Sequence, residues 1–274
     1  MEKLNVAVIF GGCSPEYGVS LESASSVIEN MDREKYNPIP IGISPEGAWF
    51  RFYGDAGKIS SGAWLGSSDC ALAVISSNRA KPGLLVFDKD KWSIEKLDVV
   101  FPVLHGKCGE DGTVQGLIEL AGIPLVGCNT MSSALCMDKE RAHSLVRASG
   151  ISVPASFVFN RSTDIGRIEA RADILGYPLF VKPVRAGSSF GVSKIANRQE
   201  LAAAIGLAFE YDDEVVIEEN ISGFEVGCAI LGNDTLTIGE IDEIELNGSF
   251  FDFSEKYTLK TSTIHVPARR KPQR

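Results

Sequence analysis

The strongest candidate for chemistry is a lysine followed by a loop of glycine and serine. Lys182 comes directly after the apolar run of residues 179–181, and Gly187, Ser188 and Ser189 follow a few positions later. A loop of this composition can surround a phosphate with backbone N–H groups and hydroxyls, and Lys182 would add positive charge beside it. A polar hairpin loop without a ligand is the alternative.

A second candidate is a loop in which His105, Lys107, Glu110 and Asp111 crowd among glycines. It follows a predicted strand and precedes a predicted helix, whose free N–H groups attract anions. Loops often carry function, which favours a binding loop. An ordinary surface loop with a histidine in it is the competing interpretation.

A third candidate is the turn Gly11-Gly12-Cys13-Ser14, with Glu16 just beyond it. The turn lacks the third glycine of a dinucleotide fingerprint and the Gly-Lys-Ser/Thr of a P-loop. Its position is more informative, because ligands of open α/β sheets bind at the carboxyl ends of strands. A plain tight turn with a solvated glutamate is the alternative.

The fourth candidate is the end of the apolar run 215–217, where Glu218 follows and Glu225 comes seven residues later. The backbone of such a segment can read the edge of an adenine, and the acids could take its amino group and the ribose hydroxyls. A charged strand end is the alternative. Strand alternation divides the acids of residues 240–245 between two faces, with Ile241, Glu243 and Glu245 on one and Asp242 and Ile244 on the other, which favours a half-solvated strand over a metal cluster.

The elements that must position these residues alternate between strand and helix, the pattern of an α/β protein. Apolar runs predict strands at residues 5–10, 38–43, 98–104, 124–127, 156–159, 179–181, 215–217, 224–231 and 236–246. Helical periodicity predicts helices at 24–31, 114–121, 131–146 and 201–208. Asn129 is the predicted N-cap of the third helix, Gly150 its stop, and Asn197 with Glu200 a capping box. Residues 54–92 show no clear period.

Composition restricts the class of protein. The chain has 274 residues, of which 44% are hydrophobic and 23% charged, and its formal net charge is −9. These values are typical of a globular protein of about two domains and argue against a nucleic-acid partner. No apolar run reaches the ~20 residues of a membrane helix, and the N-terminus lacks the layout of a signal peptide. We therefore expect a cytoplasmic protein that binds no membrane, in which the six separated cysteines are buried as small apolar residues.

Taken together, these stretches resemble the D-alanine–D-alanine ligase family of ATP-grasp enzymes. The matching motifs are Phe10-Gly11-Gly12-Cys13-Ser14-Pro15-Glu16, Leu104-His105-Gly106, Gly109-Glu110-Asp111-Gly112, Met137-Asp138-Lys139, Lys182-Pro183, Gly187-Ser188-Ser189 and Glu255-Lys256-Tyr257. They occur in the family's order over most of the chain. Details such as Val126-Gly127-Cys128 look most like the vancomycin-resistance branch, and within it like the D-alanine–D-serine ligases.

The resemblance implies a parallel α/β (pre-ATP-grasp) substrate-binding domain at 1–127, in keeping with the strand–helix alternation, and an ATP-grasp fold split into 128–217 and 218–274. It implies that a D-alanine carboxylate takes the γ-phosphate of ATP and that the amine of a second D-amino acid then displaces phosphate. Lys139, Lys182 and Ser189 would contact the ATP phosphates, Glu218 the adenine and Glu225 the ribose. Glu16 would bind the first D-alanine with His105 nearby, Ser188 and Tyr257 would join Glu16 in closing a lid, and Lys256 would approach the transferred phosphate.

The resemblance also implies Mg²⁺ or Mn²⁺, a homodimer, and a role in peptidoglycan precursor synthesis and vancomycin resistance. The family's metal ligands lie beyond the position of Ala268, and four of the last six residues are basic. The sequence thus predicts a C-terminally incomplete ATP-grasp fold, no metal ligands and no ligase turnover from these residues alone. A frayed tail, or a non-catalytic remnant that binds nucleotide at most, are the alternatives. D-Serine is the first expectation for the second substrate and D-alanine the next, whereas the Lys256-Tyr257 pair argues against D-lactate.

Overall fold

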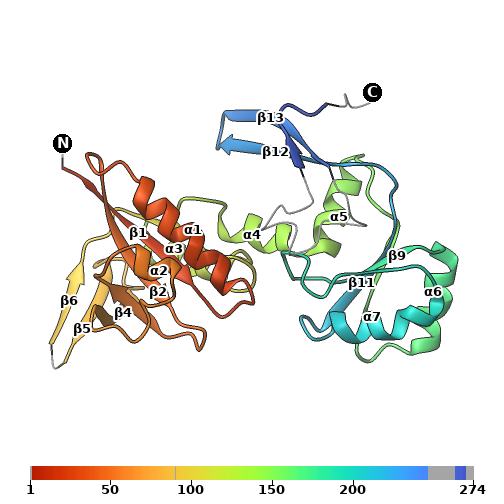
Figure 1. Cartoon of the computed structure of the whole chain (residues 1–274), viewed down its shortest axis with the longest axis horizontal. Helices are drawn as coiled ribbons and strands as arrows, with labels where there is room; N and C mark the ends of the chain where they lie inside the picture. The colour runs from red at the N-terminus through yellow and green to blue at the C-terminus, as the bar shows by residue number, and fades with distance from the viewer. Residues whose placement is uncertain (1, 90, 246–262, 270–274) are drawn as a thin grey trace. The chain divides into compact units, whose positions relative to one another are not determined.

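The computed structural model describes residues 2–89, 91–245 and 263–269, and these pack as two compact units (Figure 1). The first unit holds residues 1–153 together with 184–187, and the second holds 154–183 and 188–274. Within the described residues, no helix combines the length and apolar composition that crossing a membrane would require. The predicted boundaries near 127 and 217 both fall inside these units, and the three-domain division stays a prediction.

The first unit is built on a seven-stranded sheet in the order β6-β5-β4-β3-β2-β1-β7. One end of the sheet is parallel, because β1 (Leu4–Gly11) pairs in parallel with β2 (Tyr36–Ile43) and with the edge strand β7 (Val99–Pro102). The predicted strands at 5–10 and 38–43 are therefore confirmed, and the one at 98–104 is found in shortened form. Of the strand expected at 124–127, only an isolated parallel bridge between Leu125 and Val100 is found.

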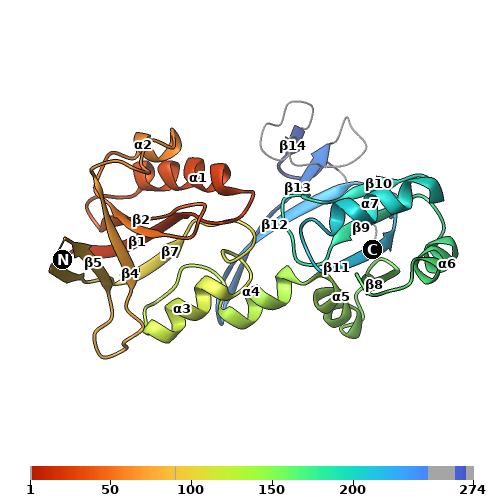
Figure 2. The same ribbon diagram turned by 90° about the horizontal axis from the view of Figure 1, so that it is seen from below.

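Helices cover both faces of this sheet, as Figure 2 shows for α1 and α3. Successive residues of β1 point to opposite faces. Val6, Val8 and Phe10 pack with α1 (Tyr17–Asn30), whereas Ala7 and Ile9 belong to the cluster that contains α3 (Thr113–Ala121). The predicted stripes at 24–31 and 114–121 are the buried faces of these two helices.

The expected parallel α/β domain is found in β1, β2 and β7, and the rest of the sheet adds antiparallel strands. Four strands continue the sheet from β2 as a meander: β3 (Trp49–Phe52), β4 (Cys70–Ile75), β5 (Leu84–Asp88) and β6 (Lys91–Glu95). The short helix α2 (Gly57–Ser60) and the buried Trp64 lie between β3 and β4. Residues 54–92, which show no clear period, thus contain much regular structure.

Residues 131–146 form two helices rather than one. α4 (Thr130–Met137) begins at the predicted N-cap Asn129, whose side chain accepts a hydrogen bond from Ser132 N. α5 (Lys139–Ala148) begins at Asp138, whose carboxylate accepts one from Arg141 N. The predicted apolar stripe is not a buried face, since Leu145 and Val146 are exposed. Gly150 follows the end of α5 in a left-handed conformation, as predicted for a stop.

The second unit contains a four-stranded antiparallel sheet in the order β10-β9-β11-β8. Its strands are β8 (Ser156–Asn160), β9 (Leu179–Pro183), β10 (Ser193–Ile195) and β11 (Glu214–Glu219). One face packs against α6 (Ile165–Leu175) and α7 (Leu201–Ala208), the latter preceded by the 3₁₀ turn η1 (Arg198–Glu200). Alternate residues such as Lys182 and Glu218 therefore belong to the other face.

A second sheet of this unit follows along the chain. β12 (Glu225–Gly232) and β13 (Leu236–Glu245) form the predicted antiparallel pair, and β14 (Thr263–His265) pairs with β13. The predicted strand is confirmed as β13, but residues 236–241 are exposed on both faces rather than on one. Glu243 is 2% exposed and pairs with Arg269 at 2.9 Å, because a buried carboxylate needs a compensating partner.

The cysteines are not buried, contrary to the expectation. Cys70 is partly buried, and the other five are exposed as free thiols. Cys13 and Cys108 lie in the loops that follow β1 and β7, and Cys128 lies in the loop before α4. Their positions follow from the loops that carry them rather than from the apolar character of the thiol.

Candidate active site

The second and third candidate loops, which carry His105 and Glu16, lie against each other at the carboxyl ends of β7 and β1. These strands are neighbours in the sheet, so the loops that follow them emerge side by side. Ser14 Oγ donates a hydrogen bond to the carbonyl of His105 at 2.7 Å, which joins the two loops. The expectation that the loops of Glu16 and His105 come together is thus confirmed, although the two residues are 89 positions apart in the sequence.

Glu16 is a buried acid closed in by glycine backbone. Its side chain is 3% exposed at the start of α1. A Cβ placed on Gly106 would lie 1.9 Å from Glu16 Oε2, and one on Gly187 would lie 3.2 Å from Oε1. Both glycines therefore leave room for the carboxylate. The sequence marked these glycines only as members of motifs, because their contact with Glu16 depends on the fold.

His105 is partly buried, and its ring faces α1. His105 Nε2 lies 3.5 Å from Ser23 Oγ, at the limit of a hydrogen bond. Inside the same loop, the Glu110 carboxylate accepts a hydrogen bond from Gly106 N at 2.7 Å, and Asp111 accepts one from Cys108 N at 2.8 Å. These carboxylates fix the shape of the loop, so they act first as structural groups.

Lys139 is held at the start of α5 by the segment that leads into the Gly/Ser loop. Its Nζ donates to the carbonyl of Ala186 at 2.7 Å and to that of Val184 at 3.3 Å. Asp138, which is 3% exposed, pairs with Arg141 and lies 3.8 Å from Arg185. Sequence reasoning missed this supporting role of Asp138, although an aspartate between two helical segments is an N-cap signal.

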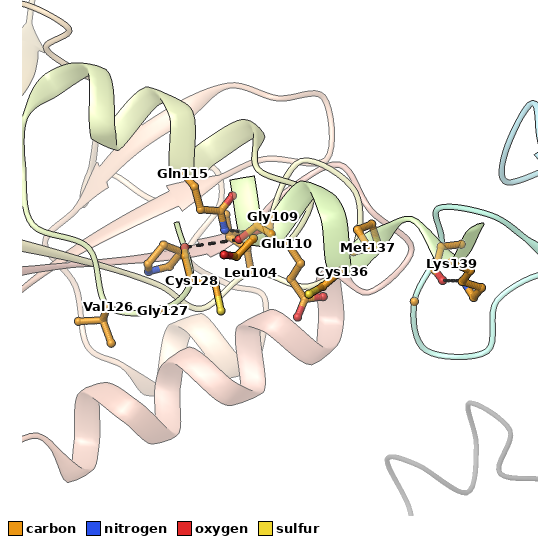
Figure 3. A pocket seen from close by; sticks show the side chains of 15 residues that line it. Leu104, Gly109, Glu110, Gln115, Val126, Gly127, Cys128, Cys136, Met137 and Lys139 are labelled. Carbon is orange, nitrogen blue, oxygen red and sulfur yellow. Dashed lines mark hydrogen bonds between the residues drawn. The ribbon is translucent and has the colours of Figure 1, made fainter. Parts of the chain in front are cut away.

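A pocket of about 480 Å³ adjoins Lys139 in the first unit (Figure 3). Its walls come from β7 and the loop after it, from α3, from α4 and from residues 186 and 187. The lining residues are Pro102, Leu104, Gly109, Glu110, Gln115, Val126, Gly127, Cys128, Ser132, Ser133, Cys136, Met137, Lys139, Ala186 and Gly187. Gln115 Nε2 donates to the carbonyl of Gly109 at 2.8 Å and so ties α3 to the loop. The volume suits a small-molecule ligand.

Lys182 and Glu218 form an ion pair on the face of the β9–β11 sheet opposite the helices. Lys182 is directly opposite Val216 in the antiparallel register, so Glu218 is its diagonal neighbour. The Glu218 side chain is 6% exposed and that of Lys182 is 23% exposed. Lys182 Nζ also lies 4.9 Å from the centroid of the Phe180 ring, within range of a cation–π contact. The sequence motifs predicted both residues, but not their pairing.

The other predicted residues are placed as follows. Ser188 and Ser189 both have positive φ, +48° and +62°, which non-glycine residues seldom adopt. Such backbone strain clusters at ligand-binding loops. Glu225 is exposed at the first position of β12. Lys256 and Tyr257 lie outside the described residues.

Among the described residues, no group of three or more His, Cys, Asp and Glu side chains could hold a metal ion, so no step is assigned to Mg²⁺.

Comparisons with known proteins bear directly on these loops. The family model "D-ala D-ala ligase N-terminus" matches residues 5–128, and "D-ala D-ala ligase C-terminus" matches residues 145–274. The chain belongs to the D-alanine–D-alanine ligase family. This is a family of ATP-dependent ligases, and the fold described above is its mixed α/β architecture with an ATP-grasp core.

Individual relatives agree with this assignment. The vancomycin B-type resistance protein VanB of Enterococcus faecalis is 47% identical over 92% of this chain and 70% of its own length. The D-alanine–D-alanine ligase of Caldicellulosiruptor bescii is 44% identical over 98% of this chain and 74% of its own. Among solved structures, the VanG D-Ala:D-Ser ligase from Enterococcus faecalis is 55% identical, with a TM-score of 0.87 over 98% of this chain and 78% of that chain.

Proposed function

We propose that this ligase joins D-alanine to a second D-amino acid, D-serine before D-alanine, through an acyl phosphate made from ATP. The observation that carries the proposal is the setting of Glu16. A carboxylate that is 3% exposed, with glycine backbone on two sides, can hold a compact ammonium group, but leaves little room for a bulky one. The ammonium of D-alanine has this size and charge.

The proposed ATP contacts follow from the lysines and the Gly/Ser loop. Lys139 and Lys182 would bind phosphate oxygens, since ammonium groups form charge-assisted hydrogen bonds with them. Ser189 would cover the γ-phosphate, Glu218 would accept from the adenine amino group, and Glu225 would bind the ribose. The ammonium groups of Lys139 and Lys182 oppose the negative charge that builds up during phosphoryl transfer.

The second substrate is proposed from the relatives. The VanG D-Ala:D-Ser ligase is 55% identical to this chain, which supports D-serine. An apolar pocket discriminates only weakly, by roughly 10²-fold or less, against an added hydroxyl, so D-alanine remains the close competitor. In this proposal Ser188, Tyr257 and Glu16 form the polar link that closes the lid, and Lys256 approaches the transferred phosphate. It includes Mg²⁺ or Mn²⁺ as a cofactor, a homodimer, and a cytoplasmic role in peptidoglycan synthesis and vancomycin resistance.

The first test measures D-alanine binding by titration calorimetry with Glu16→Gln. We expect roughly 10- to 100-fold weaker binding, because hydrogen bonds to charged groups contribute about 1.5–3 kcal/mol. Glu22→Gln is the matched control, since Glu22 is exposed on the same helix. Unchanged D-alanine binding by Glu16→Gln would refute the assignment. ATP binding without any D-alanine binding by the unmodified chain would favour the nucleotide-binding remnant instead.

The second test compares kcat/KM for D-serine, D-alanine and D-lactate by release of phosphate. It uses the 274-residue chain and also this chain continued by the last part of the VanG ligase, because the relatives are longer than the matched stretch. We expect D-serine first and D-lactate last, and a preference for D-lactate would overturn the substrate proposal. The prediction that the 274 residues alone do not turn over is checked in the same assay.

A further inference from the structure

Asp138 lies at the junction of α4 and α5, and its carboxylate is buried. The side chain is 4% exposed, and a buried carboxylate needs compensating donors. Its Oδ1 accepts a hydrogen bond from Arg141 N at 3.0 Å. Its Oδ2 pairs with the guanidinium of Arg141 and lies 3.8 Å from Arg185 Nη1. The carboxylate therefore joins the start of α5 to a residue 47 positions later in the chain.

The residues on either side of Arg185 hold Lys139. Lys139 Nζ donates to the carbonyl of Ala186 at 2.7 Å, as Figure 3 shows, and to that of Val184 at 3.3 Å. The backbone N–H of Lys139 also donates to the Val184 carbonyl, at 3.2 Å. All of these residues belong to the first unit. Lys139 thus rests on a short segment that Asp138 anchors at its middle residue.

We propose that Asp138 is a positioning residue for ATP binding, which orients the ammonium group of Lys139 and does not contact the nucleotide. With 4% exposure, its side chain offers a ligand almost no surface. As the N-cap of α5 it fixes the backbone at Lys139, the first residue of that helix. Through Arg185 it fixes the two carbonyls that direct the ammonium group. The inference rests on the proposed contact between Lys139 and the ATP phosphates.

Orientation of a lysine matters for affinity because its ammonium group sits on a flexible four-carbon stem. A free lysine side chain loses conformational entropy when a ligand fixes it, and this loss weakens binding. Carbonyls that already hold the Lys139 ammonium in place reduce the loss. The segment can do this only while it is itself held, which is the part that we assign to the Asp138 carboxylate.

The sign of the effect separates positioning from simple electrostatics. Removing the negative charge of Asp138 would by itself favour an anionic ligand through space. Positioning predicts the opposite result, since Lys139 would lose the anchor of the segment that holds it. Asp138→Asn is the informative change, because an asparagine side chain can still cap the helix. The variant therefore keeps the cap and loses only the ionic contacts with Arg141 and Arg185.

Titration calorimetry of the full chain with ATP and with adenosine tests the inference. We expect Asp138→Asn to weaken ATP binding by roughly five- to tenfold and to leave adenosine binding unchanged, because only the phosphates would reach Lys139. Asp164→Asn is the matched control and should change neither affinity. Asp164 is the N-cap of α6 and accepts from Arg167 N at 3.1 Å. An equal loss of ATP and adenosine affinity in Asp138→Asn would indicate a purely structural role and overturn the inference.

A double-mutant cycle shows whether Asp138 acts through Lys139. In the Lys139→Met background, Asp138→Asn should change ATP affinity by less than about twofold. Arg185→Met, which keeps the helix cap, is the second variant and should also weaken ATP binding, with circular dichroism to check the fold. Unchanged or tighter ATP binding by Asp138→Asn or Arg185→Met, or additive effects of Asp138→Asn and Lys139→Met, would overturn the inference alone. Unchanged ATP binding by Lys139→Met would overturn it together with the proposed Lys139 contact.

Discussion

Lys182 and Glu218 form an ion pair between the neighbouring strands β9 and β11. The pair lies on the face of the sheet opposite the one that packs against α6 and α7. The pair lies in a partly buried setting, on the side where the proposed nucleotide would bind. The pair is therefore structural before it is functional, and the two roles can be separated by mutation.

Lys182→Met should lower both stability and ATP affinity. The buried Glu218 loses its compensating ammonium, and we expect a loss of about 1–3 kcal/mol in the free energy of unfolding of this unit. The double variant Lys182→Met with Glu218→Gln should regain much of this stability but no ATP affinity. Hydrogen exchange of β9 and β11 peptides in urea reports the stability, and ATP titration the affinity. Lys194→Met is the control, because Lys194 is the exposed residue of β10.

Gly106→Ala should be far more damaging than an ordinary glycine substitution. Its Cβ would lie 1.9 Å from Glu16 Oε2, in addition to the strain of an alanine at φ +70°. Gly62→Ala is the matched control, because Gly62 has φ +74° and nothing within 4 Å of a Cβ. We expect D-alanine binding to be lost only in Gly106→Ala, as measured by calorimetry. Similar binding by the two variants would contradict the close packing of Gly106 on Glu16.

Asp98 should contribute stability that depends on pH. The Lys96 ammonium, first, and the hydrogen bond from Asn5 N hold the pKa of this carboxyl below its ordinary 3.8. A lowered folded-state pKa stabilises the fold above the unfolded pKa, and this contribution is lost as the pH falls through the folded value. Asp98→Asn should therefore lower Tm at neutral pH by roughly 2–4 °C. The difference from the unmodified chain should shrink below about pH 4. A constant difference would contradict the prediction.

Cys70 should be the slowest of the six thiols to react with iodoacetamide. Burial, and then the charge of Asp69, raise the pKa of the Cys70 thiol, and its Sγ donates to the carbonyl of Trp64 at 3.1 Å. The exposed Cys128 and Cys136 should react at least about tenfold faster, because the thiolate is the reactive form. Peptide mass mapping over time measures the rates. Equal rates at Cys70 and Cys136 would show that the thiol environments do not differ as described.

Apolar periodicity and capping residues predicted the helices that depend on neighbouring residues in the sequence. The helix at 114–121 follows from its apolar period, and α4 begins at Asn129 because an asparagine side chain caps the free N–H groups there. The prediction of one helix from Met131 to Val146 was wrong, because apolar periodicity takes no account of Asp138, which caps a second helix there. An apolar period indicates a continuous helix only where no residue within it caps a second one.

Features that depend on distant contacts could not be predicted in this way. Residues 54–92 form hairpins whose apolar side chains are exposed on one face, so the usual apolar–polar alternation of a half-buried strand is missing. The burial of Glu16 depends on Gly106 and Gly187, which are 90 and 171 positions away. Motif resemblance identified these residues, whereas composition and periodicity could not predict that they are in contact in the fold.

The order of strands in the first sheet has a consequence for how the protein folds. β2 to β6 are consecutive neighbours, whereas β1 and β7 pair across about 90 residues of chain. Closing that long loop costs more entropy than forming successive hairpins, so we expect the meander to form early and β7 to join last. Pulsed hydrogen exchange would then protect the amides of β4 and β5 before those of β7. Since β7 carries the His105 loop to the side of Glu16, the chain would gain its substrate-binding residues only in the final step of folding.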